Sequence, residues 1–338
     1  MGRKLWVILL SVVAMISAAA QAQEKSPVVR LDPALDAIVA SDAKVETVAE
    51  GFGFTEGPVW VRKGGYLLFS DIPANVIHKW SPGDRKVSVF LDKSGFTGTD
   101  PTGVGALRPD GRALIGSNGL TVDRQGRVIF CAHGDRQIVR LEADGRRTTL
   151  ASHYEGKRLN SPNDVVLKSD GALYFTDPPA GLRGRDQDPK KELPYNGVFL
   201  LKGGKLQLLI QDLPFPNGVT FSPDEKVFYV NSAADRKIFR LEVKPDGTVA
   251  NRQLFMDMTS DKAEGNPDGM KVDEKGNLYS TGPGGIWIMS PAGKHLGTIA
   301  FPEVPANLAF GDADGKTLYV TARTGLYRVR LQIPGVRP

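Results

Sequence analysis

The sequence predicts an all-β protein, a six-bladed β-propeller in which each blade has four strands. A unit of polar head, alternating apolar strand, turn and second alternating strand recurs six times, at spacings of 38 to 62 residues. The period is two throughout, and no long helical pattern interrupts it. The last unit lacks a fourth strand, whereas a spare strand precedes the first unit, as in a ring that the N-terminal strand closes.

Each unit begins with a head of five residues that leads into the first strand of a blade. The heads are Glu56-Gly-Pro-Val-Trp, Asn118-Gly-Leu-Thr-Val, Asn163-Asp-Val-Val-Leu, Asn217-Gly-Val-Thr-Phe, Asp268-Gly-Met-Lys-Val and Ala306-Asn-Leu-Ala-Phe. A turn and a second strand follow each head, and the second strands begin at Tyr66, Arg127, Ala172, Val227, Asn277 and Lys316. Third strands then begin at Val76, Gln137, Gly197, Lys237, Gly285 and Gly325.

A fourth strand completes five of the six units. These strands are expected at Lys86–Phe90, Arg147–Leu150, Leu206–Ile210, Arg252–Phe255 and His295–Ile299. The sixth unit has only a Pro- and Gly-rich tail after Leu331, so we expect Val45–Ala49 to supply its missing strand. Two β-sandwiches would explain neither the missing last strand nor the spare first one.

The N-terminus predicts a secretory signal peptide over residues 1–22. Arg3 and Lys4 precede an apolar run from Leu5 to Ala20, and the run is short for a membrane span of about 20 residues. Cleavage is expected between Ala22 and Gln23, which would place the mature protein in the periplasm or outside the cell. An uncleaved N-terminal anchor is the alternative.

Two further regions follow the predicted signal peptide. Residues 23–44 form an N-terminal extension with a short helix near Pro33, and residues 45–333 form the propeller. No second apolar segment follows the first, so no membrane contact is expected after cleavage. The sole cysteine, Cys131, excludes an intrachain disulfide, and we expect a buried free thiol.

The charge balance argues against a nucleic-acid partner. The chain has 43 Lys and Arg against 38 Asp and Glu, a formal charge of +5, which falls to +3 once Arg3 and Lys4 are removed. No Gly-x-Ser-x-Gly elbow, phosphate-binding loop or His-Glu-x-x-His motif is present. A serine hydrolase or a nucleotide enzyme is therefore disfavoured.

The heads predict a metal site. First strands of propeller blades line the central channel, so Glu56, Asn118, Asn163, Asn217 and Asp268 are expected to gather at one mouth. Carboxylate and carboxamide oxygens suit Ca²⁺, and Mg²⁺, Mn²⁺ or Zn²⁺ would also be compatible. The alternative is that Asn-Gly and Asp-Gly recur only because they form turns. Glu56 does not fit that alternative, because Glu is not a turn former.

Several motifs resemble those of the senescence-marker-protein/gluconolactonase (regucalcin-like) family, in its bacterial gluconolactonase type. They are Glu56-Gly-Pro-Val-Trp, Asn160-Ser-Pro-Asn-Asp-Val-Val, Phe175-Thr-Asp-Pro-Pro-Ala-Gly-Leu, Pro216-Asn-Gly-Val-Thr-Phe-Ser-Pro-Asp and Pro267-Asp-Gly-Met-Lys-Val-Asp. They occur in the family's order, and the resemblance extends from about Val45 to Leu331. It implies a six-bladed propeller that hydrolyses a sugar lactone with one divalent cation in the channel.

The resemblance also implies roles for individual residues. Glu56, Asn163, Asn217 and Asp268 would bind the metal, Asn163 would also touch substrate, and Asp268 would act as the general base. Vertebrate-type members carry an Arg two residues before the position of Asn163, where this chain has Ser161.

Further residues are candidates for binding substrate. Arg158 and Asn160 lie just upstream of Ser161, and they are expected to bind sugar hydroxyls together with His133 and Asn118. His133 could equally be a structurally bonded histidine. The connections 94–117 and 181–195 are expected to overhang the channel, or else to be plain exposed loops.

The sequence leaves three functions open. The first is a metal-dependent hydrolase that opens an aldonolactone; the second is a non-catalytic propeller that binds a sugar or a protein; the third is a related esterase acting on non-sugar esters. The expected partner is a small-molecule lactone, and the expected state is a monomer or a weak homodimer.

Overall fold

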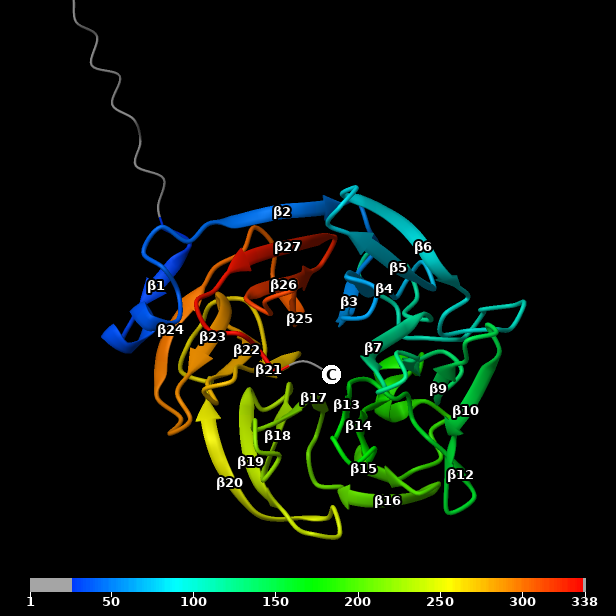
Figure 1. Ribbon diagram of the computed structural model, residues 1–338. Coiled ribbons are helices and arrows are strands. Elements are labelled where there is room, and N and C mark those ends of the chain that lie inside the picture. The colour runs from blue at the N-terminus through cyan, green and yellow to red at the C-terminus, as the bar shows by residue number, and fades with distance from the viewer. Residues whose placement is uncertain (1–25, 337–338) are drawn as a thin grey trace, which may run out of the picture.

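The computed structural model describes residues 26–336, in which six antiparallel sheets surround a central axis (Figure 1). Blade 1 consists of β3 (Thr55–Val61), β4 (Tyr66–Asp71), β5 (Val76–Ser81) and β6 (Lys86–Asp92). Blade 2 consists of β7 (Ser117–Val122), β8 (Val128–Ala132), β9 (Gln137–Leu141) and β10 (Arg147–Ala151). Blade 3 consists of β13 (Val165–Leu167), β14 (Leu173–Asp177), β15 (Gly197–Lys202) and β16 (Lys205–Ile210).

The remaining three blades complete the predicted propeller. Blade 4 consists of β17 (Pro216–Phe221), β18 (Val227–Ser232), β19 (Lys237–Val243) and β20 (Val249–Asp257). Blade 5 contains β21 (Met270–Val272), β22 (Leu278–Gly282), β23 (Gly285–Met289) and β24 (His295–Ile299). Blade 6 contains β25 (Pro305–Gly311), β26 (Thr317–Ala322), β27 (Gly325–Arg330) and β2 (Val45–Glu50). The fold class is therefore confirmed.

Blade 6 closes the ring as predicted, by pairing the N-terminal strand β2 with β27. The antiparallel register sets Val45 opposite Val329 and Glu50 opposite Gly325. The outer edge of β27 is thereby covered, and no inner strand is left without a neighbouring blade. In Figure 1 the six first strands β3, β7, β13, β17, β21 and β25 surround the axis.

The N-terminal extension adds to blade 5, which the sequence did not indicate. Strand β1 (Val28–Arg30) pairs antiparallel with β24 and gives blade 5 a fifth strand. The predicted helix is the 3₁₀ helix η1 (Pro33–Ala37), which Asp32 caps by accepting a hydrogen bond from the Ala34 amide at 2.8 Å. The predicted signal peptide lies outside the described residues. Within residues 26–336, no helix has the length and apolarity needed to span a bilayer.

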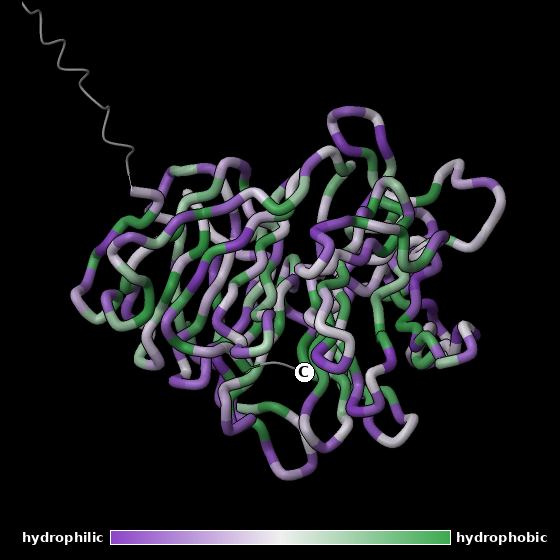
Figure 2. The backbone as a smooth tube through the Cα atoms, turned by 45° about the horizontal axis from the view of Figure 1, so that its top comes forward, coloured by the Kyte–Doolittle hydropathy of each residue, from purple (hydrophilic) through white to green (hydrophobic). Residues whose placement is uncertain are grey.

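Hydrophobic side chains fill the spaces between blades. Tyr174, Phe221 and Phe228 form one such aromatic contact between blades 3 and 4, with ring centroids 4.8 to 5.4 Å apart. In Figure 2 apolar stretches follow the strands of the body, whereas many connecting loops are hydrophilic. Cys131 on β8 is fully buried and unpaired, as predicted.

Candidate metal and active site in the channel

A β-bulge marks the head of the inner strand in four blades. In blade 1, for example, Glu56 pairs with Ser70 and Val59 with Leu68, so the inner strand carries one extra residue. The same shift occurs at the heads of β7, β17 and β25. A bulge interrupts the alternation of side chains and turns the head toward a new direction. The head side chains therefore depart from the regular in-and-out order of the strands.

The glycine that follows most heads is required by the neighbouring blade. A Cβ atom on Gly57 would lie 2.0 Å from the carbonyl oxygen of Asn118, and one on Gly218 would lie 1.9 Å from that of Asp268. The Gly119 amide donates a 2.7 Å hydrogen bond to the carbonyl of Asn163. Adjacent heads are thus in backbone contact, and the glycine serves this close approach rather than a simple turn.

The side chains of the heads alternate in chemistry around the axis. Blades 1, 3 and 5 supply carboxylates, and blades 2, 4 and 6 supply carboxamides; the residues are Glu56, Asn118, Asp164, Asn217, Asp268 and Asn307, with Asn163 beside Asp164. Asn307 donates a hydrogen bond to Glu56 Oε2 at 3.0 Å. The sixth polar head is therefore Asn307 and not its neighbour Ala306, which was aligned with the other heads in the sequence.

The backbone of Asp268 is fixed by two buried side chains on neighbouring strands. Its amide donates to Thr281 Oγ1 at 2.7 Å, and its carbonyl accepts from Asn231 Nδ2 at 2.6 Å. Asn231 is fully buried, and its Oδ1 accepts from the Gly218 amide at 3.2 Å. Asn231 therefore links the head of blade 4 to the head of blade 5.

The carboxylates crowd one another at the channel mouth. Burial raises the pKa of Asp268 well above its usual range, and the charges of Glu56 and Asp164 raise it further, while the Asn217 side chain opposes the shift. Burial also raises the pKa of Glu56, against hydrogen bonds from the Gly57 amide and Asn307. The region lacks a compensating positive charge at the heads themselves, and a cation would relieve the repulsion.

The oxygen atoms of the site fit a divalent cation. The carboxamide oxygens of Asn118 and Asn217 are buried and receive no hydrogen bond from the described residues. An acceptor buried without a donor is unfavourable, and a hard cation would satisfy it. Within residues 26–336, no three His, Cys, Asp or Glu side chains form a metal-binding group. The donors would thus be a mixed set of carboxylates and carboxamides.

Access from solvent differs among the predicted metal ligands. Glu56, Asn163 and Asn217 are 2, 5 and 6% exposed, whereas Asp268 is partly exposed. Asn163 anchors its backbone by donating its amide to the Thr176 carbonyl at 2.8 Å, and its side chain makes no hydrogen bond within the described residues. Asp268 therefore lies close enough to Glu56 and Asp164 for their charges to raise its pKa, while part of the residue still reaches solvent.

Two of the predicted substrate-binding residues are buried and bonded to backbone carbonyls. Asn160 is fully buried, and its Nδ2 donates to the carbonyls of Asp177 and Tyr195 at 3.0 and 2.9 Å. His133 is 1% exposed, its Nδ1 lies 3.3 Å from the Pro162 carbonyl oxygen, and η2 (Pro179–Gly181) covers it. In this arrangement both residues support the segment before Asn163.

The other two candidates are placed differently. Arg158 lies on a small hairpin of β11 (His153–Tyr154) and β12 (Lys157–Arg158), where its guanidinium donates to the Asp135 carbonyl at 2.9 Å. Its amide donates to Glu192 of the 181–195 connection at 2.8 Å. Arg158 thus lies on the β11–β12 hairpin beside the 181–195 connection, whereas Asn118 is one of the heads around the channel.

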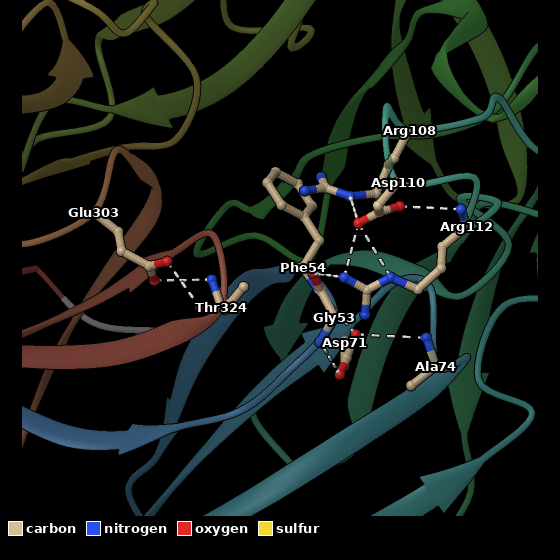
Figure 3. A network of polar contacts seen from close by, with 9 residues as sticks. All are labelled: Gly53, Phe54, Asp71, Ala74, Arg108, Asp110, Arg112, Glu303 and Thr324. Carbon is tan, nitrogen blue, oxygen red and sulfur yellow. Dashed lines mark hydrogen bonds and ion pairs between the residues drawn. The ribbon is translucent and has the colours of Figure 1, made fainter.

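The two long connections, residues 94–117 and 181–195, contact each other. An isolated bridge joins Val104 to Leu182, and Arg183 donates to the Val104 carbonyl at 3.0 Å. Figure 3 shows how the 94–117 connection is held against the segment that precedes β3: the Arg112 guanidinium donates to the Gly53 carbonyl at 3.4 Å, and the Arg108 guanidinium lies 4.3 Å from the centroid of the Phe54 ring. Within the connection, Asp110 pairs with Arg112 at 2.8 Å.

Three functional candidates were missed in the sequence. Asp164 follows the head Asn163 where most other heads have glycine, and its Oδ2 accepts a hydrogen bond from the Val219 amide of blade 4 at 3.1 Å. Asn307 was displaced by one position in the alignment. Lys271 lies on the inner strand of blade 5 and seemed to be an ordinary polar residue of an alternating strand. Of these three residues, only Asp164 could have been found in the sequence, because it stands where four other heads have glycine.

Comparison with known proteins identifies the family of this chain. Residues 54–324 match the SMP-30/gluconolactonase/LRE-like region, so the chain belongs to that family. It is 39% identical to a gluconolactonase of Zymomonas mobilis over 318 residues, which cover 91% of this chain and 87% of the relative. It is 28% identical to regucalcin of Xenopus laevis, over 83% of this chain and 87% of that protein.

A solved structure shows the same arrangement of blades. The gluconolactonase of Xanthomonas campestris superposes with a TM-score of 0.77 at 32% identity, and the match covers 91% of this chain and 96% of that one.

Proposed function

We propose that this protein is a lactone hydrolase that opens a sugar lactone to the corresponding aldonic acid, with a divalent cation bound at the heads. The observation that carries the proposal is the convergence of Glu56, Asp268 and two buried, donor-free carboxamide oxygens at one channel mouth. Family membership and the gluconolactonase relatives support the same reaction class.

The proposed metal ligands are Glu56, Asn163, Asn217 and Asp268. When bound, a divalent cation such as Ca²⁺ supplies polarisation of the lactone carbonyl and stabilises the negative charge that develops on its oxygen. The protein contributes a rigid frame, because Thr281 and Asn231 fix the backbone of Asp268. The Asn163 side chain makes no hydrogen bond to the part of the chain that the structure describes, and it is also available to a substrate hydroxyl.

Asp268 is the proposed general base. Its carboxylate accepts a proton from a water molecule whose oxygen forms a bond to the lactone carbonyl carbon. The ring carbon–oxygen bond then breaks, and the proton held on Asp268 returns to the departing ring oxygen as a hydroxyl. The products are one aldonic acid and the regenerated carboxylate. Partial exposure of Asp268 gives water a route to it.

A covalent nucleophile is not needed in this scheme. Burial raises the pKa of the Cys131 thiol well above its usual range, so the thiol stays protonated and shielded from substrate. An ester as reactive as a strained lactone is attacked by an activated water directly. The proposal therefore assigns no role in bond formation to Cys131.

The test is a pH-stat assay of the purified protein on glucono-1,5-lactone, corrected for spontaneous hydrolysis. Hydrolysis should stop after dialysis against a chelator and return when Ca²⁺, Mg²⁺, Mn²⁺ or Zn²⁺ is added back singly. An aryl ester and an organophosphate, run in parallel, test the non-sugar esterase. Full activity after metal removal, or none on any lactone with metal present, would contradict the proposal.

We further propose that the chain is exported and processed. The sequence signal rests on Arg3, Lys4 and the apolar run from Leu5 to Ala20. Expression in a Gram-negative host, followed by fractionation and N-terminal sequencing, should give a periplasmic protein that begins at Gln23. Retention of Met1 on a membrane-bound product would instead support an uncleaved anchor.

A further inference from the structure

The channel continues below the heads as a cavity of about 270 Å³ that the inner strands of all six blades line. It begins at Pro58, two residues after Glu56, and the C-terminal tail reaches its far end at Val336. Most of the inner-strand lining is apolar, with Val59, Val166 and Phe221 among the residues. A charged side chain in this setting therefore requires an explanation.

Lys271 is that side chain. Among the lining residues contributed by described inner strands, Lys271 alone carries a charge, because Arg124, Lys168 and Glu225 lie in the turns at the far end. Lys271 is half-buried, and its Nζ donates to the Met270 carbonyl at 2.9 Å. Within residues 26–336 it forms no ion pair.

The charge of Lys271 acts on the carboxylates above it. It lowers the pKa of Asp164, against the larger effect of burial, and it also lowers that of Glu56, where burial and Asp164 raise the pKa. The head Asp268 lies three residues earlier on the same segment. At a rise of about 3.3 Å per residue of extended chain, three residues separate Asp268 from Lys271 by about 10 Å, so the ammonium group lies within electrostatic range of the carboxylate cluster.

The charges of this cluster balance in a simple way. Glu56, Asp164 and Asp268 bring three carboxyl groups to one region of low dielectric constant, and the three carry three negative charges when all are ionised, as a bound cation favours. A divalent cation neutralises two of them, and Lys271 supplies the third positive charge. Without the cation, Lys271 is the one positively charged residue on the described inner strands that can offset the repulsion.

We propose that Lys271 is a positioning residue that serves as the internal counter-charge of the metal site, stabilising the metal-free channel and limiting the affinity for the cation. The inference rests on the proposed metal site. Since Lys271 and the cation compensate the same carboxylates, each weakens the other's stabilisation, and the coupling is reciprocal.

The test is a set of variants that alter the charge at one position. Lys271→Met removes the charge and keeps the length of the side chain, and Lys271→Arg retains the charge. Lys168→Met is the matched control, because Lys168 lies on the same cavity but already pairs with Glu225 at 3.2 Å and Asp170 at 3.7 Å. Calorimetric titration with Ca²⁺ alone and thermal melting with and without Ca²⁺ are the measurements.

Lys271→Met should bind Ca²⁺ about tenfold more tightly than the unaltered protein, as the loss of a repulsive charge at this range predicts. Its metal-free form should melt at a lower temperature, and saturating Ca²⁺ should restore most of the loss. Lys271→Arg and Lys168→Met should keep the original affinity. The tightening should shrink at high ionic strength, which a packing effect would not do.

Two results would overturn the inference while leaving the proposed function intact. One is an unchanged or weaker Ca²⁺ affinity in Lys271→Met, and the other is an equal change in Lys168→Met. If Lys271→Met does not fold, Lys271→Gln gives the same comparison with a polar side chain. Failure of the unaltered protein to bind any divalent cation would overturn the inference and the metal site together.

Discussion

Asp268 and Asp273 lie five residues apart in blade 5, and both belong to Asp- and Gly-containing segments of the kind that forms turns. Asp273 is fully buried and saturated with donors: it accepts from the amides of Lys275 and Asn277, from Asn277 Nδ2 and from the Tyr279 hydroxyl, at 2.7 to 3.1 Å. Its carboxylate therefore organises the turn between β21 and β22.

Asp268 is the opposite case. It is partly exposed, and its nearest charged neighbours are the carboxylates of Glu56 and Asp164. Residue type does not separate the two aspartates, and each has a glycine within the next three residues, Gly269 after Asp268 and Gly276 after Asp273. The neighbours of each carboxylate distinguish the two aspartates. Hydrogen-bond donors around a carboxylate indicate a structural role, whereas other carboxylates around it indicate a site suited to a cation.

The largest expected effect comes from neutralising the two aspartates separately. Asp268→Asn should lower kcat for lactone hydrolysis by about 10²- to 10⁴-fold, because the amide cannot accept the proton from water. Asp273→Asn should leave kcat within about twofold in protein that is folded. The measurement is the initial rate in the pH-stat, with circular dichroism to confirm folding. Equal losses of kcat in both variants would remove the distinction.

The reverse pattern is expected for stability. Asp273→Asn should lower the free energy of unfolding by about 2 to 4 kcal/mol, because a donor group would replace an oxygen that two side-chain donors now share. Asp268→Asn should cost little, or should stabilise the metal-free protein by removing a repelling charge. Urea unfolding in the presence of chelator gives both values. A larger loss in Asp268→Asn would contradict the assignment.

An intermediate effect is expected at Gly218, whose backbone packs against the Asp268 carbonyl, so that a change there affects both stability and the site. Gly218→Ala would set a Cβ against the Asp268 carbonyl and should destabilise the protein by about 1 to 3 kcal/mol. It should also lower activity about tenfold, because a 1 Å displacement of a catalytic group has large kinetic effects. The exposed Gly83, with open space around its Cβ direction, provides the control Gly83→Ala. Equal changes in stability and activity in the two variants would show that the close approach of neighbouring heads does not position Asp268.

The smallest effect concerns His133. Burial lowers the pKa of His133 to about 4 from 6.5. Between these pH values the unfolded chain binds a proton that the folded protein does not, so stability falls as the pH decreases. Acidification from pH 6.5 to 5.5 should therefore cost about 1 kcal/mol at this residue. His133→Gln should show a correspondingly smaller loss in urea unfolding, and an unchanged loss would indicate a charged or exposed histidine.

Much of the fold could be predicted because a period of two specifies strands directly. The second and third strands appear where the alternation placed them, and the unpaired Val45–Ala49 segment revealed the closure of blade 6. Strand β1 and the β11–β12 hairpin were missed, because runs of two or three residues carry too little periodicity to distinguish them from loop.

The site was predicted in part. The heads gather because the topology brings first strands together, and this could be inferred from Glu56, Asn118, Asn217 and Asp268. The bulges could not be inferred, because one extra residue leaves no trace in composition, and so Ala306 was aligned where Asn307 reaches Glu56. The metal, the base and the substrate contacts of Arg158, Asn160 and His133 remain predictions.

The pairing of β2 with β27 also orders events in time. These partners lie about 280 residues apart in sequence, so a ribosome must finish nearly the whole chain before the circle can shut. Until β27 has been synthesised, β2 has no partner strand, and we expect the blades already formed to make an open arc rather than a ring. In a circular permutant that begins at β3 and joins the old termini, only residues 331–338 and 23–44 would separate β27 from β2 once the predicted signal peptide is omitted. Such a permutant should fold faster without any change in the finished ring.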